Sequence, residues 1–492
     1  MKHFFSLVLV LCTAVVVTVA QDRTVKGTVT DSDGSAIAGA TIQVKGTKGG
    51  AYSKKDGSYV IKVSDGATLV FRSIGKLVKE VVLGTSDVVN VTMENDKSTE
   101  SEVVVTAIGL DRSKKSLGYA TQEIKSDEII NSRETNIVNS LASRVAGVQV
   151  NSSTGVPGAS SYIRIRGSAS LTGNNQPLFV VDGIPIDNSQ VASENTVGSV
   201  AYSNRAMDID PNNIESMNVL KGPAATALYG IRAAGGAIII TTKKGKATEG
   251  GKINVNVSGS WAFDQVNKLP ELQNQYSQGA GGRYAFSTGA SRSWGAKIDT
   301  LFYDGNASYK WDRRGAIVGK SNPNAKTQVT AIDNYDSFFR TGLTQNQSVT
   351  LSGGSSTANF LLSFSNLVAD GVVPNSTWAR RNLKLSSSAV IAPNLTASAN
   401  INYANSGGTR IQQGSNVSGV MLALVRTPPT FDNANGYGKD AVNTPGAYMF
   451  ADGTQRTYRA GAGYDNPFFT VNENPFTDNV NRVFGNIQLD WG

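Results

Sequence analysis

Apolar and polar residues alternate in long segments through the C-terminal half of the chain. A period of two places successive side chains on opposite faces of a β-strand. The pattern therefore predicts about six long antiparallel strands. They fall within KINVNVSGSWAFD (252–264), 346–353, 357–368, 379–391, LTASANINYA (395–404) and NRVFGNIQLDWG (481–492).

This alternation fits two architectures: a soluble sandwich with its apolar face packed inward, or a membrane barrel with that face turned outward. The predicted segments reach the roughly 9–11 residues that a tilted strand needs to cross a bilayer. Aromatic residues also lie near the predicted strand ends, as in an interfacial girdle. Both features favour the barrel, and the aromatic residues are Trp261, Phe263, Tyr403 and Trp491.

The connections between these segments alternate between long and short. Long stretches at 265–345 and 406–480 contrast with the short links GGSS (353–356) and APN (392–394). Outer-membrane barrels alternate long extracellular loops with short periplasmic turns. A sheet in lipid must close, and the smallest such barrels have about eight strands. We therefore expect residues 250–492 to form the first strands of an incomplete antiparallel transmembrane β-barrel.

Residues 22–95 contain shorter β-prone runs separated by turn signals. Asp33-Gly34, Asp56-Gly57 and Asp65-Gly66 are each flanked by alternating residues. An Asp-Gly pair in this setting is a strong hairpin signal. We predict a small all-β sandwich here, which would act as a spacer or docking module without catalysis.

Residues 115–245 mix helix and strand signals. A helix is predicted from the N-cap Thr135 to Gly147, because the apolar residues between them fall on one helical face. A second helix is predicted from Ile214. Strands are predicted in SYIRIRGSAS (161–170), in PLFVVDGIPI (177–186) and at 237–241. This combination indicates a compact α+β domain.

The arginines of SYIRIRGSAS, Arg164 and Arg166, alternate with Ile163 and Ile165 and should occupy the polar face of their strand. PLFVVDGIPI should turn at its Asp-Gly pair. The Lys-Gly pair at 221–222 is followed by Pro223 and not by Lys-Ser/Thr. This excludes a phosphate-binding loop of the GxxxxGK[ST] kind.

The N-terminus has the features of a cleaved signal peptide, residues 1–20. Lys2 precedes an apolar run, and small residues precede Gln21. An uncleaved anchor is the alternative, although the run is short for a spanning helix. Cleavage would remove Cys12 and His3, the only cysteine and the only histidine. No thiol or imidazole chemistry would remain, so we expect no enzyme, metal site or cofactor.

The net charge of +8 is mild for 492 residues. The chain has no Lys/Arg cluster that would indicate nucleic-acid binding. Between the first two predicted domains lies SEVVVTAIG (101–109), a β-prone run too short to fold alone. It could be an ordinary linker, an edge strand of a neighbouring domain, or a segment that pairs with another protein.

Several of these motifs resemble known families. GTVTDSDGSAIAGATIQVKGT and DGSYVIKV resemble the carboxypeptidase-regulatory-like domain. SEVVVTAIGLDRSKKSLGYAT is similar to a TonB-box region, and four later motifs are similar to successive plug motifs. In this order the chain resembles a SusC/RagA-type TonB-dependent outer-membrane transporter. The plug-like motifs are SYIRIRGSASL, PLFVVDGIPID, NIESMNVLKGPAATALYG and GGAIIITTKKG.

The resemblance implies a domain order and a set of site residues. Residues 96–114 would be a linker with the TonB box, 115–245 the plug, and 250–492 the partial barrel. TonB, the inner-membrane energy transducer, would pair with the strand of Glu102, Val103, Val104, Val105, Thr106 and Ala107. The plug motifs would contribute Arg164, Arg166, Gly167, Asp182, Gly183, Lys221, Gly222, Tyr229 and Gly230. The charged residues among these are expected first to seal the plug and second to contact ligand.

The family further implies an outer-membrane location with periplasmic N-terminal domains, in contact with membrane lipid. The expected activity is uptake of an oligosaccharide or peptide, with a SusD-type lipoprotein as lid. The long loops, rich in Tyr, Trp and Asn, suit capture of such oligomers. Two alternatives remain open. One is a secreted multi-domain β-rich adhesin, and the other is a non-functional truncated transporter.

Overall fold

The computed structural model forms two compact units, residues 1–103 with 113–116 and residues 104–112 with 117–492. The predicted signal peptide lies outside the described residues. Where the structure is described, it has no helix that is both long and apolar enough to span a membrane. The described residues are 22–47, 49–73, 76–94, 103–105, 111–113, 121–152, 154–168, 170–171, 175–188, 199–222, 229–248, 251–286, 291–414, 417–459 and 463–491.

The first unit is the predicted β-sandwich. One sheet has the order β4-β1-β7 and the other β3-β2-β5-β6. Between them lies a core that includes Val25, Ile42, Tyr59 and Phe71. The strands are β1 (Asp22–Asp31), β2 (Thr41–Val44), β3 (Gly50–Tyr52), β4 (Ser58–Ser64), β5 (Thr68–Arg72), β6 (Lys79–Val82) and β7 (Val91–Met93).

The three Asp-Gly pairs all form turns, with each glycine at positive φ. Two of them do not join paired strands, so the hairpin prediction is wrong there. Asp56-Gly57 links β3 to β4 and Asp65-Gly66 links β4 to β5, and each link crosses from one sheet to the other. The turn chemistry was therefore readable from sequence. Which strands pair with one another could not be predicted from these turns.

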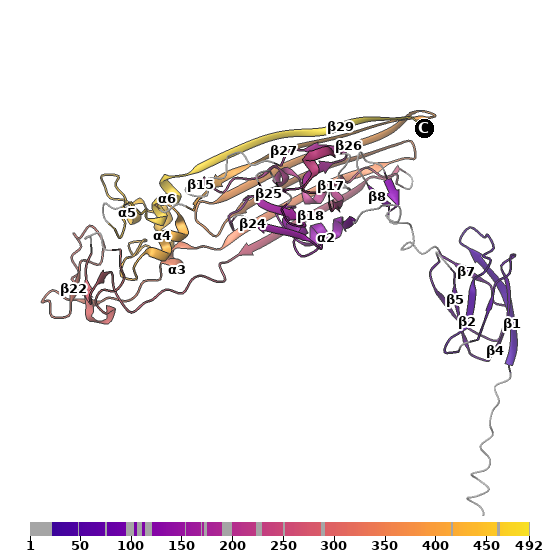
Figure 1. Ribbon diagram of the computed structural model, residues 1–492, viewed down its shortest axis with the longest axis horizontal. Helices are drawn as coiled ribbons and strands as arrows, with labels where there is room; N and C mark the ends of the chain where they lie inside the picture. The colour runs from indigo at the N-terminus through magenta and orange to yellow at the C-terminus, as the bar shows by residue number, and fades with distance from the viewer. Residues whose placement is uncertain are drawn as a thin grey trace, which may run out of the picture. The chain divides into compact units, whose positions relative to one another are not determined.

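The second unit is built on a six-stranded antiparallel sheet of order β18-β24-β25-β26-β27-β29. Figure 1 shows these strands as long ribbons that run side by side. The short links predicted from sequence are tight turns, and the long connections are the predicted loops. The strands are β18 (Asn254–Asp264), β24 (Gly342–Gly354), β25 (Ala358–Asp370), β26 (Thr377–Ala392), β27 (Leu395–Arg410) and β29 (Phe476–Trp491).

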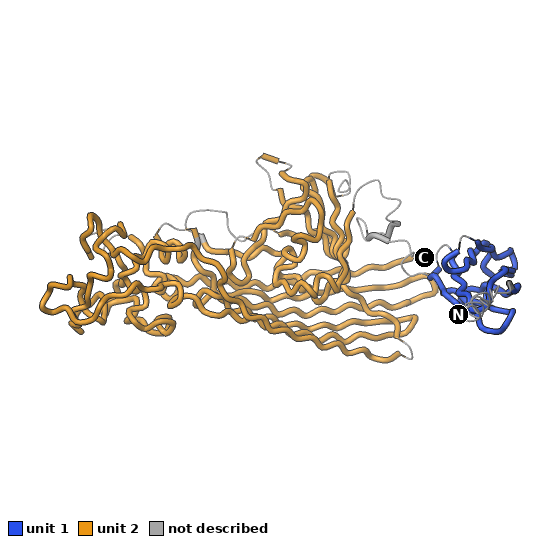
Figure 2. The backbone as a smooth tube through the Cα atoms, turned by 90° about the horizontal axis from the view of Figure 1, so that it is seen from below, with its two compact units in different colours: residues 1–103, 113–116 blue, residues 104–112, 117–492 orange. Residues whose placement is uncertain are grey.

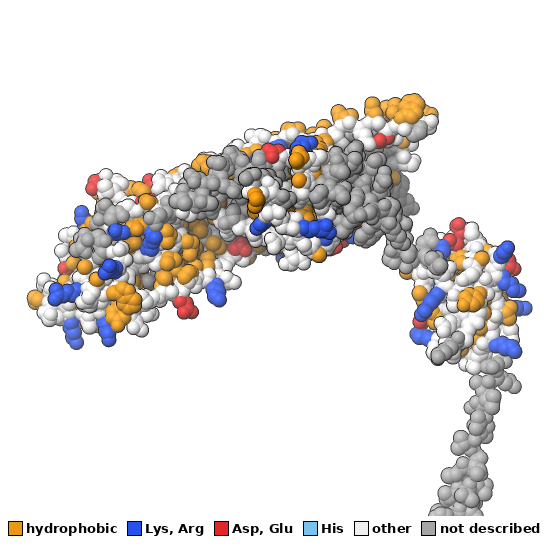
Figure 3. Space-filling view, in the orientation of Figure 1, with side chains coloured by type: hydrophobic (Ala, Val, Ile, Leu, Met, Phe, Trp, Pro, Cys, Tyr) orange, Lys and Arg blue, Asp and Glu red, His pale blue; other side chains and the backbone are white. Residues whose placement is uncertain are grey.

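This sheet has its polarity reversed relative to a soluble sandwich. On β26, Leu383 and Leu385 are 46% and 43% exposed, whereas Lys384 is fully buried. On β29, Ile487 is 80% exposed, and apolar side chains are visible along the outer surface of the long strands in Figure 3. The apolar face is thus the outer one, as in a barrel wall. The other face carries buried Ser, Asn, Lys and Arg side chains.

The predicted aromatic girdle is only partly confirmed. Trp261 and Phe263 lie near the loop end of the sheet, and Trp491 lies at the opposite end, since it pairs with Leu395. Tyr403 lies in the middle of β27, so its placement near a strand end is wrong. The strand continues past Tyr403 to Arg410, further than the alternation in the sequence indicated.

The predicted plug segment forms a five-stranded mixed sheet of order β10-β16-β17-β13-β14. Figure 2 shows this part of the chain against one face of the long strands. Its core includes Ile163, Phe179, Met217 and Ile240. Its elements are β10 (Thr121–Lys125), α2 (Ser126–Asn131), η4 (Asn139–Leu141), β11 (Val148–Ser152), β12 (Ser161–Ile165), β13 (Leu178–Val181), β14 (Ile184–Ile186), β15 (Ser199–Val200), η5 (Arg205–Asp208), η6 (Pro211–Asn213), β16 (Ile214–Leu220) and β17 (Ala237–Thr242).

Both helices predicted in this segment are wrong. From Thr135 to Gly147 only the short 3-10 helix η4 forms, although the predicted apolar face is buried. The Asn136 side chain accepts from Val138 N at 3.0 Å, and Ser143 adopts a φ of 62°, so the regular helix is interrupted. The residues from Ile214 onward form β16, because β10 and β17 pair with both of its edges. Tertiary pairing overrides local propensity at this position.

The two long loops fold together into an ordered region beyond the end of the sheet. Its main core includes Phe338, Leu424, Tyr448 and Phe468. The sequence had suggested loops without this internal structure. The elements are β19 (Gly279–Ala280), β20 (Arg283–Tyr284), η9 (Ile298–Thr300), β21 (Leu301–Tyr303), β22 (Ile317–Gly319), β23 (Thr327–Gln328), α3 (Asn334–Phe338), β28 (Gln412–Gln413), α4 (Val420–Arg426), η10 (Gly438–Asn443), α5 (Pro445–Tyr448) and α6 (Pro467–Glu473).

Candidate functional site: the buried interface between the central segment and the long sheet

Asp208 is the centre of a buried polar network that joins the central segment to two strands of the long sheet. Its side chain is fully buried at the end of η5. Oδ1 accepts from Ser406 Oγ at 2.7 Å, and Oδ2 lies 3.3 Å from Arg482 Nη1. Arg205, from the same turn of helix, reaches Oδ2 at 3.2 Å. One carboxylate therefore binds β27 and β29 at once.

Arg380, on β26, reaches the same part of the central segment from the sheet. Its Nη1 donates to the carbonyl oxygens of Met207 and Ile209 at 2.9 and 3.0 Å. Its Nη2 lies 3.4 Å from Asp210 Oδ1. The neighbouring inward residue Asn382 donates to the Asp208 carbonyl at 2.8 Å. A planar guanidinium with several donors suits this task, because it binds carbonyl and carboxylate groups at once.

Arg410, at the end of β27, makes a second attachment nearer the loops. It donates to Asp478 Oδ1 at 2.8 Å, to Pro157 O at 3.0 Å and to Ser203 Oγ at 2.7 Å. The first contact lies within the sheet and the other two reach the central segment. Gly158 follows at a φ of 71°, and a Cβ there would overlap the Trp378 indole. The backbone can approach the sheet this closely only because residue 158 has no side chain.

The central segment is also paired with a loop. β15 forms an antiparallel ladder with β28, with Val200 opposite Gln412. Val156 packs against the core of the loop region. Both the sheet and the loops therefore bind the central segment. A movement of the loops would act on it directly through the β15–β28 pairing.

The long sheet, the segment bound to its polar face and the sandwich can now be compared with known proteins. Residues 113–237 match the TonB-dependent Receptor Plug Domain family, and residues 25–105 match the CarboxypepD_reg-like domain. The chain is 29% identical over 491 residues to the TonB-dependent receptor SusC of Bacteroides thetaiotaomicron, which covers 96% of this chain and 43% of that protein. The chain carries the plug domain of TonB-dependent receptors and is similar to SusC over nearly its whole length.

Further comparisons agree with this assignment. The TonB-dependent receptor P3 of Formosa agariphila is 31% identical over 365 residues, covering 73% of this chain and 30% of that protein. The solved structure of the RagAB peptide importer in the "open-open" state matches with a TM-score of 0.54 at 20% identity, covering 79% of this chain and 40% of that one. This second likeness shows the fold. The chain thus spans less than half the length of these relatives, which are receptors and transporters and not enzymes.

The central segment corresponds to the plug domain. Its predicted charged residues Arg164, Arg166 and Lys221 lie outside the network around Asp208 described above. Arg164 Nη1 donates to Ser168 Oγ at 3.1 Å, and its guanidinium lies 5.5 Å from the centre of the Tyr162 ring. Lys221 Nζ donates to Gln122 Oε1 at 3.0 Å. Arg166 donates to the Lys221 carbonyl at 3.4 Å. These contacts lie within the plug, so a sealing role for the three residues stays a prediction.

Burial lowers the pKa of Lys221, and the positive charge of Arg166 adds to this effect. The Arg166 guanidinium also contacts the Lys221 backbone, so the two cationic residues are neighbours. Tyr229 packs beside the buried residues Leu220 and Ile239.

The predicted glycines of the plug motifs occupy turns. Asp182 and Gly183 have φ values of 47° and 85° and form the two-residue turn between β13 and β14. The predicted turn at this Asp-Gly pair is therefore found. Asp182 also accepts from Thr242 N and Oγ1 at 2.9 and 2.6 Å, which ties the turn to β17. Gly167, Gly222 and Gly230 likewise adopt positive φ.

The TonB-box prediction can be placed only in part. Val103–Val105 form the strand β8, which pairs with β9 (Asp111–Ser113). Glu102, Thr106 and Ala107 lie outside the described residues. Of the readings left open by the sequence, the structure thus gives a short strand with a local partner. Pairing with TonB stays a prediction.

Sequence reasoning missed the residues that join the plug to the sheet. A usable signal was present: Arg380 and Arg482 fall on the polar face of strands whose other polar-face residues are mostly small or uncharged. Arginine at such positions indicates a buried acidic partner. Asp208 and Asp210, in the sequence MDIDP, form a closely spaced acidic pair in the plug. In the part of the chain that the structure describes, no group of three or more His, Cys, Asp or Glu side chains could hold a metal ion.

Proposed function

We propose that the protein imports a nutrient oligomer across the outer membrane, driven by TonB. The observation that carries the proposal is the plug bound through buried ion pairs to the polar face of a sheet whose opposite face is apolar and exposed. A plug bound in this way would block a pore, because it fills the polar interior. It would also need work to be displaced, since several charged hydrogen bonds must break together.

The strand β8 supports a mechanical role for Glu102–Ala107. Its backbone already adopts the extended form that pairing with another strand requires. In this structure β9 pairs with one edge of β8. TonB would replace β9 as the pairing partner, so that one set of main-chain hydrogen bonds is exchanged for another. The grip would then depend on the backbone more than on side chains.

Location, partner and cargo follow from the same proposal. The sandwich and TonB box would lie in the periplasm, and the loop region would face the outside. The cargo would be a glycan or a peptide, and a SusD-type lipoprotein would close over the loops. Two relatives support this range: the receptor SusC and the RagAB peptide importer.

The test is a deletion of residues 102–107 in the protein expressed from its full reading frame. We expect labelled oligomer to bind at the cell surface as before, while uptake is lost. The matched control deletes residues 95–100, the same length of polar linker. Uptake that survives the first deletion, or is lost equally in both, contradicts TonB-driven pulling through this strand.

A further inference from the structure

In the β-sandwich, strand β4 leaves one of its edges without a partner among the described strands. It pairs with β1 along its whole length of seven residues and ends the sheet of order β4-β1-β7. A free edge of this kind presents a row of main-chain N–H and C=O groups, to which another strand can hydrogen-bond. β4 therefore offers a binding site for an added strand.

The other edges of the sandwich are shorter, and charged side chains lie on two of them. β3 and β7 have three residues each, and β6 has four. Lys79 Nζ donates to the Thr92 carbonyl oxygen of β7 at 2.9 Å, and Glu80 of β6 lies 2.6 Å from Lys45. Short and charged edges resist pairing with other strands. Of the described edges of this unit, β4 is thus the one that suits a full strand.

A groove of about 420 Å³ runs beside β4. Residues 60–64 of β4 line one side of it, and residues 49–51, at the edge of the other sheet, line the opposite side. Gly49 and Gly50 project no side chain into this space, and nothing lies within 4 Å of the Cβ position of Gly49. An incoming strand would therefore meet little steric obstruction beside β4.

The sequence of β4, SYVIKVS, is nearly symmetric about Ile61. Its buried and exposed residues alternate, with Ile61 on the buried side. An added strand must keep this alternation, because a shift of one residue exchanges the two faces. If the added strand is a second β4 in antiparallel orientation, pairing centred on Ile61 keeps the alternation and matches all seven residues. Centres at residues 60 and 62 also keep it, but they match only 58–62 and 60–64.

The pairing centred on Ile61 also places the side chains favourably. Lys62 is the only charged residue of β4, and a lysine on an edge strand usually opposes pairing. Here it would lie opposite Val60 of the other copy, over which its aliphatic stem can pack. Tyr59 would lie opposite Val63, a pair of the aromatic and β-branched kind that stabilises sheets. A centre at residue 62 would instead set two lysines directly opposite each other.

We propose that two copies of this chain associate through their β4 edges, about a twofold axis that passes through Ile61. The two three-stranded sheets would join into one sheet of order β7-β1-β4-β4-β1-β7. Both copies use the same surface, so the contact closes on itself and does not propagate into a fibre. The contact uses none of the residues of the proposed import mechanism, and its failure would leave that mechanism untouched.

The first test cross-links two differently tagged, co-expressed copies of the full-length protein, with other cysteines replaced by serine. One copy carries Val60→Cys and the other Lys62→Cys. On oxidation the two variants should link to each other roughly fivefold more than either links to itself, because residues 60 and 62 lie directly opposite and like residues lie on a diagonal. The matched control pairs Lys62→Cys with Val82→Cys, since Val82 is an exposed valine on the edge strand β6 (71% against 55% for Val60).

The control pair should give no mixed product. Equal yields of mixed and self-linked product, or the same yield in the control pair, would overturn the proposed register and with it the proposal. Cross-linking of Val60→Cys to a different protein, without the mixed product, would assign the edge to another strand and would equally overturn pairing of two copies.

A charge exchange gives a second readout that needs no cross-link. Val60→Lys sets two lysines opposite each other, so energy transfer between copies labelled at Lys55→Cys should fall roughly threefold or more. Adding Lys62→Glu to the same chain should restore the transfer, because each introduced lysine then faces a glutamate of the other copy. An unchanged signal in Val60→Lys, or no recovery on adding Lys62→Glu, contradicts the contact.

Discussion

The guanidinium of Arg380 on β26 and the carboxylate of Asp210 in the plug lie 3.4 Å apart, and the two side chains are 1% and 0% exposed. Buried ion pairs add little net stability, because desolvation offsets much of the attraction. Loss of one partner is costly, since it leaves the other charge buried and unpaired. Both buried charges are therefore paired only when the plug is correctly positioned against the sheet.

Replacing Arg380 with alanine should loosen the plug. The change leaves Asp210 without its partner and removes the donors to Met207 O and Ile209 O. The expected cost is about 3–5 kcal/mol. In planar bilayers, with the protein expressed from its full reading frame, we expect the wild type to stay closed and Arg380→Ala to show frequent openings.

Arg381→Ala is the control for this experiment. Arg381 is the next residue on the same strand, is exposed, and lies on the opposite face. Its loss should leave conductance unchanged. Equal conductance in Arg380→Ala and wild type would mean that the ion pair does not hold the plug.

Gly158→Ala tests the close approach of plug and sheet. The added Cβ would meet Trp378, and a φ of 71° costs a non-glycine residue roughly 1–2 kcal/mol by itself. We expect the free energy of unfolding to fall by at least that amount, measured by urea denaturation. Gly155→Ala should change it by less than about 0.5 kcal/mol, because nothing lies within 4 Å of its Cβ position. Similar values for the two variants would contradict the tight packing at residue 158.

The alternation of residues was enough to predict the strands of the long sheet. Leu383 and Leu385 alternate with Asn382 and Lys384. Alternation with a period of two over such a length indicates a β-strand. It could not predict which face is buried, because a soluble sandwich and a barrel share the pattern. The structure decides this: the leucines are exposed and Lys384 is buried.

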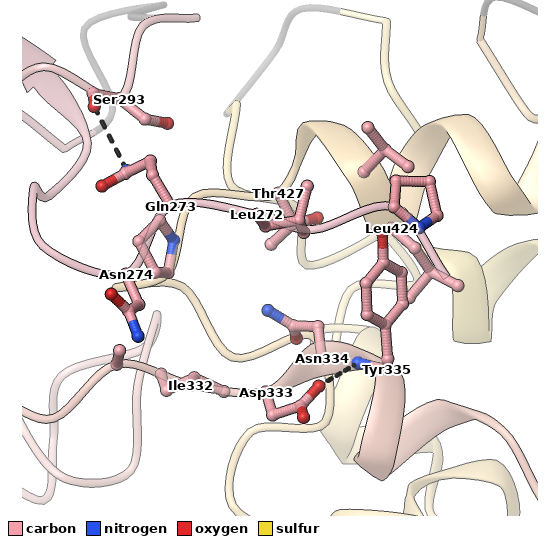
Figure 4. A pocket seen from close by; sticks show the side chains of 14 residues that line it. Leu272, Gln273, Asn274, Ser293, Ile332, Asp333, Asn334, Tyr335, Leu424 and Thr427 are labelled. Atoms are coloured by element: carbon pink, nitrogen blue, oxygen red, sulfur yellow. Dashed lines mark hydrogen bonds between the residues drawn. The ribbon is translucent and has the colours of Figure 1, made fainter. Parts of the chain in front are cut away.

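The contacts between distant segments could not be predicted from the sequence. Arg410 meets Pro157 and Ser203 across more than 200 residues. Leu272 and Tyr335 come from one long loop and Leu424 from the other, yet the three line one pocket (Figure 4) and form no motif in the sequence. Likewise β16 reads locally as a helix and becomes a strand only because β10 and β17 flank it. Each of these features is set by tertiary pairing and not by local pattern.

Contact with lipid is the central claim, and fluorescence quenching tests it most directly. A bimane label is attached at Ile487→Cys or at Gln488→Cys, adjacent residues on opposite faces of β29. Cys12 is replaced by serine if it is retained. In vesicles of brominated lipid, the label at 487 should be strongly quenched and the label at 488 nearly unaffected. Equal quenching at the two positions, or quenching of the label at 487 by aqueous iodide instead of lipid, would contradict an apolar face in the membrane.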